Sequence, residues 1–148
     1  MVVTLLVAAL AIALDQVTKS IALAQLHRPV HLLGPLGLNL TFNSGAAFSL
    51  FTGSTGVIVV VAVVVITLLG WVAWRSRTIG LSIALGLLMG GALGNLSDRL
   101  FRGHDGSVVD FITFTHWPTF NVADSCISVG AVLVVILSLR RPRPADAT

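Results

Sequence analysis

The chain of 148 residues is 55% hydrophobic and only 10% charged, with a mean hydropathy of +0.97. This composition excludes an ordinary water-soluble domain, and the length allows one integral membrane unit over residues 1–148 without a separate soluble domain. The net charge of +3 does not indicate a nucleic-acid partner, because most of the basic residues lie beside apolar segments, where a membrane surface would meet them.

Four apolar segments have about the length needed to cross a bilayer as a helix, which is roughly 20 residues. We expect spans over residues 2–26, 57–74, 78–97 and 122–139. The first segment is the least regular, because it includes Asp15 and Lys19. A cleaved signal peptide is the alternative there. However, no Lys or Arg precedes the apolar run and both signs of charge lie within it, so we expect an uncleaved span.

The arginines predict how these spans are oriented, because cytoplasmic loops of membrane proteins carry an excess of Lys and Arg. The arginines that follow the second and fourth spans are Arg75, Arg77, Arg140, Arg141 and Arg143. Placing these ends in the cytoplasm puts both termini inside, with residues 140–148 as a cytoplasmic tail. Residues 27–56 and 98–121 then face outward.

The outward segments contain two candidate strands. Leu36–Phe42 and Val108–Phe114 are rich in β-favouring residues and alternate loosely in polarity. We expect them to pair as a small sheet at the membrane surface, because unpaired strand edges are not tolerated in hydrocarbon. Gly86, Gly90 and Gly94 recur every four residues in the third span and predict a face where another helix comes close. The predicted fold is an all-α membrane protein, a four-transmembrane-helix bundle with a small outward-facing β-structure.

All six acidic residues are aspartates, and four of them lie within or at the ends of strongly apolar segments. A charge at the centre of a span costs about 2.5–3.5 kcal/mol on insertion scales, so several retained acids indicate a function. Asp15 and Lys19 are four residues apart, and we expect them to pair, either to fix helix packing or to shape a site. Asn95, Asp98 and Arg99 share a face at the outward end of the third span. An Asp98–Arg99 pair there would hold the loop, and a buried Asn95 would need partners.

Asp110 and Asp124 carry the functional prediction. Asp110 lies in an apolar strand segment, which is expected to raise the pKa of its carboxyl group. A salt bridge to Arg99 or Arg102 is the structural alternative. Asp124 follows Asn121 by three residues where the fourth span begins, which is the spacing of a capping box and needs no catalysis.

Two carboxylates that share a site do not easily both ionise, so one proton is divided between them. The ionised member takes a proton from a water molecule that attacks a peptide carbonyl, while the protonated member hydrogen-bonds that carbonyl and later protonates the leaving amine. We expect Asp124 to be ionised and Asp110 to be protonated. The rival functions are a small proton-coupled transporter that uses Asp15 and Asp124 as relays, and a non-catalytic helical scaffold.

Other catalytic patterns are missing from the sequence, which has no GxSxG, HExxH or CxxC motif and no phosphate-binding glycine loop. His116 with Asp110 and Asp124 is a weak candidate for a metal site. The residues alone therefore give little support for a metal site.

Five sequence blocks resemble those of lipoprotein signal peptidase, also called signal peptidase II, an aspartic endopeptidase family of bacterial membranes. In chain order they are Asp15-x-x-x-Lys19, Phe42-Asn43-x-Gly45-Ala46-Ala47-Phe48, Gly94-Asn95-x-x-Asp98-Arg99, Val109-Asp110-Phe111 and Phe120-Asn121-x-Ala123-Asp124-Ser125. The match runs from the first span to the fourth. Each block is weak singly, but all of them in this order are specific.

The resemblance implies that Asp110 and Asp124 are the catalytic dyad. It implies supporting or substrate-contacting roles for Asp15, Lys19, Asn43, Gly45, Asn95, Asp98, Arg99, Asn121 and Ala123. The implied substrate is a prolipoprotein whose cysteine already carries diacylglycerol, cut just before that cysteine to release the signal peptide. The implied setting is the bacterial inner (cytoplasmic) membrane, with membrane lipid around a monomer, the site toward the outer face, and no metal or organic cofactor.

Overall fold

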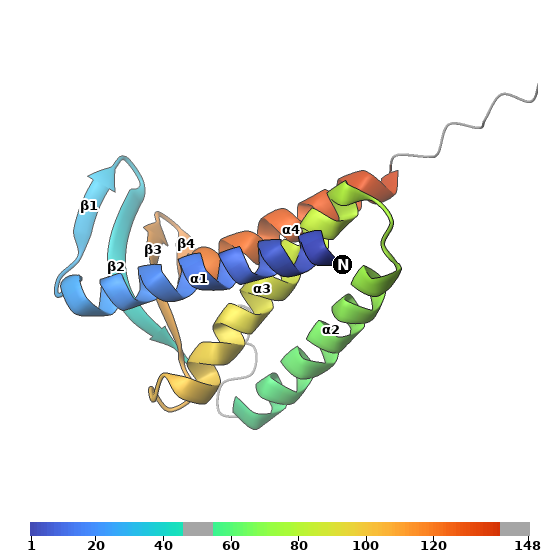
Figure 1. The fold of residues 1–148 in the computed structure, drawn as a ribbon. Helices are drawn as coiled ribbons and strands as arrows, with labels where there is room; N and C mark the ends of the chain where they lie inside the picture. Colours follow the sequence, from blue (N-terminus) through green and yellow to red (C-terminus); the bar gives the residue numbers. More distant parts are fainter. Residues whose placement is uncertain (46–54, 140–148) are drawn as a thin grey trace, which may run out of the picture.

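The computed structural model describes residues 1–45 and 55–139, which form four long helices and a four-stranded sheet (Figure 1). Within these residues, all four helices are long and apolar enough to cross a membrane, which confirms the predicted bundle. They are α1 (Val2–Gln25), α2 (Thr55–Arg75), α3 (Ile79–Phe101) and α4 (Val122–Leu139). Residues Ala46, Ala47 and Phe48 of the second sequence block lie outside the described residues. So do the tail 140–148 and its arginines.

Helix α3 is longer than its predicted span, which ended at residue 97, and continues for a further turn to Phe101. Asp98 and Arg102 pair across this turn, with Arg102 Nε 2.8 Å from Asp98 Oδ1. Such i,i+4 pairs stabilise helix ends. The helix therefore continues past the apolar stretch that hydropathy detects.

Small residues on α3 bring its neighbours close. A Cβ added at Gly86 would lie 2.7 Å from a side-chain atom of α1, and one added at Gly90 would lie 2.7 Å from the Cβ of Ala11. A Cβ added at Gly91 would collide with the backbone of Ala123 in α4. Because real side chains do not approach so closely, α1 and α4 pack against α3 only where these positions are glycine. The predicted glycine face is confirmed on the side of α1.

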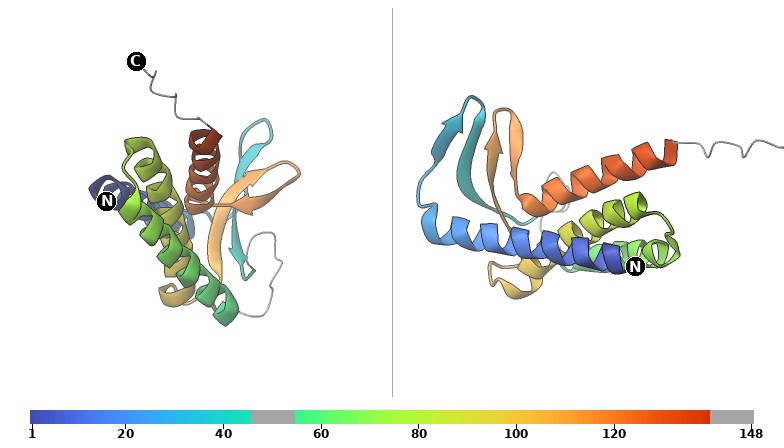
Figure 2. Two further views of the ribbon diagram at one scale, coloured as in Figure 1. Left: turned by 90° about the vertical axis from the view of Figure 1, so that its right-hand side faces the viewer. Right: turned by 45° about the horizontal axis from the view of Figure 1, so that its top comes forward.

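The sheet lies at the end of the bundle opposite the N-terminus (Figure 1). Its antiparallel order is β1-β2-β3-β4, and its strands are β1 (Val30–Leu33), β2 (Leu36–Asn43), β3 (Val108–Phe114) and β4 (Trp117–Phe120). The predicted pairing of the two central strands is confirmed. The short outer strands β1 and β4 were not predicted. Both hairpin turns project to one side of the helices (Figure 2).

Candidate active site

A cluster of buried polar side chains lies where the sheet meets α1, α3 and α4. The side chains of Asp15, Lys19, Asp98 and Asn121 are 0% exposed and that of Asp110 is 2% exposed. Groups of this kind are costly to bury unless each is paired and hydrogen-bonded. Their partners therefore define the site.

Lys19 is at the centre of this cluster. Its Nζ atom lies 2.8 Å from Asp15 Oδ2 and 2.9 Å from Asp98 Oδ2, and it donates a hydrogen bond of 2.9 Å to Asn95 Oδ1. An ammonium group has three hydrogens to donate, and all of them are used here. The predicted Asp15–Lys19 pair is confirmed.

Asp98 has different partners from the one predicted. The expected Asp98–Arg99 pair is wrong, because Asp98 forms its ion pairs with Lys19 and Arg102. Adjacent residues of a helix point in different directions, whereas residues four apart share a face. Asp98 Oδ2 also accepts a hydrogen bond of 3.1 Å from the N–H of Val109, which attaches β3 to α3.

Arg99 instead reaches the segment that follows β2. Its Nη2 donates a hydrogen bond of 2.7 Å to the carbonyl oxygen of Gly45, and its Nη1 donates one of 3.4 Å to the carbonyl oxygen of Asn95. Its Nε is buried and has no partner in the described part of the chain. One donor of this guanidinium is therefore available to another molecule.

Asp124 forms the predicted capping box with Asn121. The N–H of Asp124 donates to Asn121 Oδ1 at 2.9 Å, and the N–H of Asn121 donates to Asp124 Oδ2 at 3.1 Å. The other carboxylate oxygen of Asp124 accepts a hydrogen bond of 2.8 Å from Asn95 Nδ2. These donors and the N-terminus of α4 all favour a negative charge at this position.

Asp110 lies on β3 and receives hydrogen bonds from two amides. Its Oδ1 accepts one of 2.6 Å from Asn121 Nδ2, and its Oδ2 accepts one of 3.0 Å from Asn43 Nδ2. Burial, and then the negative charge of Asp124, raise the pKa of Asp110 to about 6, against the lowering effect of those two amides and of Lys19.

The alternative of a structural salt bridge at Asp110 is wrong. No described cation lies within ion-pair distance of its carboxylate, and the ion pairs of the cluster all involve Asp15 or Asp98. Asp110 is therefore buried without a neutralising partner in direct contact, which is the condition that raises the pKa of a carboxyl group.

Three asparagines present their amide nitrogens to the two carboxylates, and the amide oxygen of each accepts a hydrogen bond from another group of the network. Lys19 donates to Asn95 Oδ1, the N–H of Asp124 donates to Asn121 Oδ1, and the N–H of Gly45 donates to Asn43 Oδ1 at 3.0 Å. Because an amide has one acceptor end and one donor end, these contacts determine its orientation. Asn121 contacts both aspartates and joins them in one site.

Asp15 attaches α1 to the first turn of α4. Its Oδ1 accepts a hydrogen bond of 2.9 Å from the N–H of Ala123, which is fully buried. A Cβ added at Gly94 would lie 2.7 Å from Asp15 Oδ2, so the last glycine of the predicted face makes room for this carboxylate. The structure thus brings every site residue predicted from the sequence into one continuous network.

Two residues of this network were missed. Gln16 Nε2 donates to Asp98 Oδ1 at 3.0 Å, and Arg102 Nη2 donates to Gln16 Oε1 at 2.6 Å. Arg102 could have been found from the sequence, because it follows Asp98 by four residues and such residues share a helix face. A neutral glutamine beside Asp15 gave no comparable signal.

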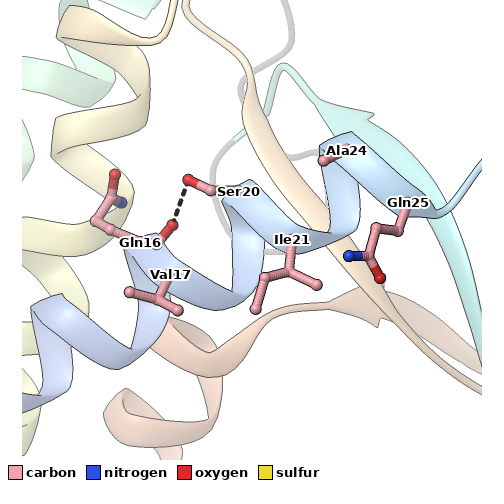
Figure 3. A pocket seen from close by; sticks show the side chains of 6 residues that line it. All are labelled: Gln16, Val17, Ser20, Ile21, Ala24 and Gln25. Carbon is pink, nitrogen blue, oxygen red and sulfur yellow. Dashed lines mark hydrogen bonds between the residues drawn. The ribbon is translucent and has the colours of Figure 1, made fainter.

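A depression of about 440 Å³ lies along one face of α1 and is lined by Gln16, Val17, Ser20, Ile21, Ala24 and Gln25 (Figure 3). Ser20 uses its hydroxyl group to donate to the carbonyl oxygen of Gln16 at 2.7 Å. Neither Asp110 nor Asp124 lines this depression, so we assign it no chemistry. Residues 1–45 and 55–139 contain no group of three metal-binding side chains.

Comparisons with known proteins identify the family to which the chain is similar. The model of the family described as signal peptidase (SPase) II matches residues 7–140. Proteins named lipoprotein signal peptidase from Rhodococcus jostii (strain RHA1) and Mycobacterium avium (strain 104) are each 43% identical over 139 residues. These alignments cover 90% of this chain and 70% and 76% of the respective relatives.

Two solved structures, each described as a bacterial membrane enzyme structure by the in meso method, are also similar. One, at 2.3 Å resolution, has a TM-score of 0.86 and 26% identity, and covers 98% of this chain and 94% of its own. The other, at 1.9 Å resolution, has a TM-score of 0.82 and 28% identity, with 94% of each chain covered. The match of the family model over most of the chain, together with these relatives, shows that the chain belongs to the signal peptidase II family of bacterial membrane aspartic peptidases.

Proposed function

We propose that this signal peptidase II removes the signal peptide from prolipoproteins with Asp110 and Asp124 as its catalytic dyad. The single observation that carries the assignment of the dyad is Asn121, which hydrogen-bonds both carboxylates and so holds them at one site. The names of the relatives support the substrate class. The transporter alternative has no support from the family assignment.

Asp124 is the general base of the proposed reaction. Its carboxylate accepts hydrogen bonds from Asn95 and Asn121 and lies at the start of α4, where negative charge is favoured. An ionised carboxylate in this position takes a proton from water as the water attacks the scissile carbonyl carbon.

Asp110 is the general acid. With a pKa of about 6, its proton is retained at a cost of only about 1.4 kcal/mol at pH 7, since one pKa unit corresponds to that free energy. A bound substrate that excludes water lowers this cost further, because desolvation disfavours the charged form. The protonated carboxyl donates to the carbonyl oxygen as charge develops there, and then protonates the leaving amine.

The other residues of the network have supporting roles in this proposal. Arg99, whose Nε has no described partner, is available to bind a carbonyl oxygen of the substrate. Asn43, Asn95 and Asn121 orient the two carboxyls through the hydrogen bonds described above. Gly45 holds Asn43 through its N–H and Arg99 through its carbonyl oxygen. The remaining members position the helices on which these groups lie: Asp15, Lys19, Asp98 and Ala123.

Cleavage of a purified prolipoprotein by isosteric variants tests the dyad. We expect Asp110→Asn and Asp124→Asn to abolish cleavage, because each removes a proton transfer that the reaction needs. Asp105→Asn is the matched control. Asp105 is an exposed loop residue with a φ of 50°, a conformation that asparagine also adopts readily, so full activity is expected. Full cleavage by either dyad variant would remove that aspartate from the mechanism.

We further propose that the substrate cysteine carries diacylglycerol, that cleavage occurs just before it, and that the enzyme acts as a monomer. Both termini would lie in the cytoplasm and the sheet on the outer face, as the arginines at positions 75 and 77 suggest. A membrane-impermeant maleimide tests this orientation in a Cys126→Ala background. Gly103→Cys is expected to react in intact cells and Arg77→Cys only after the cells are opened. The reverse pattern would contradict the orientation.

A further inference from the structure

The loop of residues 103–107, which connects the end of α3 to β3, lies outside the polar network of the site. Its residues Gly103, Asp105 and Gly106 have φ values of 75°, 50° and 74°. The carbonyl oxygen of His104 accepts a hydrogen bond of 2.8 Å from the N–H three residues further on. Left-handed residues closed by a hydrogen bond fold the chain tightly back on itself, so the loop gives His104 a defined position.

Two neighbours hold this loop beside the end of β2 and the start of α2 (Figure 1). The ring of His104 packs on the ring of Phe42, with the ring centroids 4.6 Å apart and the planes tilted by 52°. A Cβ added at Gly106 would collide with the side chain of Thr55, the first residue of α2. Aromatic rings at this separation and tilt attract each other, and the close packing at Gly106 leaves the loop little room to move away.

The ring contact is made where β2 has the least support from other strands. Strand β1 pairs with β2 only as far as Leu38, whereas β3 pairs with it as far as Asn43. Phe42 and Asn43 therefore have one neighbouring strand among the described residues. A strand end of this kind opens more easily than one with a neighbour on both sides, so the side-chain contact with His104 stabilises it.

Asn43 follows Phe42 directly and therefore points to the other face of β2, because successive side chains of a strand alternate. On that face Asn43 Nδ2 donates its hydrogen bond of 3.0 Å to Asp110 Oδ2. None of the hydrogen bonds described above for Asp110 or Asp124 comes from His104. A rotation of the strand end that releases the Phe42 ring also turns the Asn43 amide away from Asp110.

We propose that His104 is a positioning residue of the peptidase reaction. It holds Phe42 on one face of β2 and thereby keeps the Asn43 amide directed at Asp110 on the other face. This inference rests on the proposed function, because the role of Asp110 belongs to that proposal. His104 itself acts only through Phe42 and Asn43.

Loss of the ring contact has an effect that a merely structural loop would not produce. The amide of Asn43 is one of the groups that lower the pKa of Asp110, so a weaker hydrogen bond from Asn43 raises that pKa. Asp110 then keeps its proton to higher pH, and the fall of kcat/KM with rising pH moves in the same direction. The charged groups that act on Asp110 from the packed helices are unchanged: Lys19, Arg99 and Asp124.

The experiment is cleavage of a purified prolipoprotein in detergent, with kcat and KM measured across pH and Tm measured by circular dichroism. The variants are His104→Ala, His104→Phe, Asn43→Ala and the double variant His104→Ala/Asn43→Ala. His27→Ala is the matched control, because it removes an exposed histidine of the connection between α1 and β1. If His104→Ala does not fold, Phe42→Leu removes the same ring contact from the other side and has the same expected results.

We expect His104→Ala to lower kcat roughly three- to thirtyfold, less than the roughly 100-fold that a misplacement of about 1 Å can cause. Its profile of kcat/KM is expected to fall at higher pH than that of the wild type. His104→Phe keeps an aromatic ring but does not titrate, and is expected to restore both values. The double variant is expected to match Asn43→Ala, because His104 acts through Asn43.

An unmoved profile in folded His104→Ala, beside a moved one in Asn43→Ala, would overturn this inference alone, even if Tm fell. A loss in His104→Phe equal to that in His104→Ala would also overturn it, because the ring contact would not be the cause. A double variant with a larger loss of activity than Asn43→Ala would show that His104 does not act through Asn43. An unmoved profile in Asn43→Ala would overturn this inference and the proposed role of Asp110 together.

Discussion

Replacing Lys19 with methionine tests whether the buried ion network determines the stability of the fold. Lys19 is 0% exposed, and its ammonium group lies 2.8 Å from Asp15 and 2.9 Å from Asp98. Methionine has a similar shape and no charge, so the substitution removes the cation while leaving most of the packing in place. The aspartates around it then lose their shared partner.

The two carboxylates are affected unequally. Asp98 keeps its ion pair with Arg102 at 2.8 Å, whereas Asp15 loses its only described ion pair. Removing one partner of a buried ion pair typically costs about 3–5 kcal/mol, because the other charge stays buried. For a domain of this size 1 kcal/mol corresponds to roughly 2–4 °C, so we expect Lys19→Met to lower Tm by about 6–20 °C.

The measurement is thermal unfolding of the purified protein in detergent, followed by circular dichroism. Arg28→Met is the matched control, because it removes an exposed cation and is expected to change stability by less than about 0.5 kcal/mol. Adding Asp15→Asn to Lys19→Met removes the unpaired charge and is expected to restore part of the loss. The reasoning fails if Lys19→Met costs less than about 1 kcal/mol. It also fails if the double variant is no more stable than the single one.

Three further predictions concern packing, pH and the dual role of one asparagine. Gly90→Ala is expected to lower the free energy of unfolding by about 1–3 kcal/mol, because the added Cβ would lie 2.7 Å from a carbon atom of α1. The control Gly56→Ala, whose Cβ would have nothing within 4 Å, is expected to leave Tm unchanged. Equal effects of the two substitutions on Tm would contradict the packing argument. Because Asp110 acts protonated and its pKa is about 6, kcat/KM is expected to fall with rising pH above about 6. Asn43→Ala, which removes a donor that lowers this pKa, is expected to move that fall to higher pH, and an unmoved profile would count against the assignment. Asn121→Ala removes both the helix cap and the contact with Asp110, so it is expected to lose about 0.5–2 kcal/mol of stability as well as activity. Asn121→Ser keeps a capping side chain that is too short to reach Asp110, so it is expected to lose activity alone. Retention of activity by the serine variant would show that the contact with Asp110 is dispensable.

Much of the fold follows from the sequence because its signals are local. The extents of the spans depend on the transfer free energy of consecutive residues, and three of the four agree with the helices within two residues at each end. The pairing of β2 with β3 follows from alternation and β-propensity. The capping box of Asn121 and Asp124, and the pair of Asp15 and Lys19, depend only on spacing along a helix.

Signals that were weak or absent explain the misses. Strand β1 is four residues long and exposed on both faces, and β4 is equally short and contains a proline, so neither shows the alternation of a half-buried strand. The last turn of α3 begins with two charged residues, Asp98 and Arg99, and lies beyond the predicted span, which ended at residue 97. This turn is helical because Asp98 forms ion pairs with Lys19 of α1 and with Arg102 at the end of α3.

The sequence by itself determined that the chain crosses a membrane, about where it does so, and that Asp110 and Asp124 are the acids to examine, because an apolar segment makes each retained charge costly. Only the tertiary structure decided which groups surround those acids. The partner of a buried charge depends on which helices touch, and here small residues of α3 bring Lys19 of α1 to Asn95. That contact turns the Asn95 amide toward Asp124, while Asn121 holds Asp110 beside it. No local pattern records such an arrangement, since its members lie on three helices and a strand, and only packing brings them together.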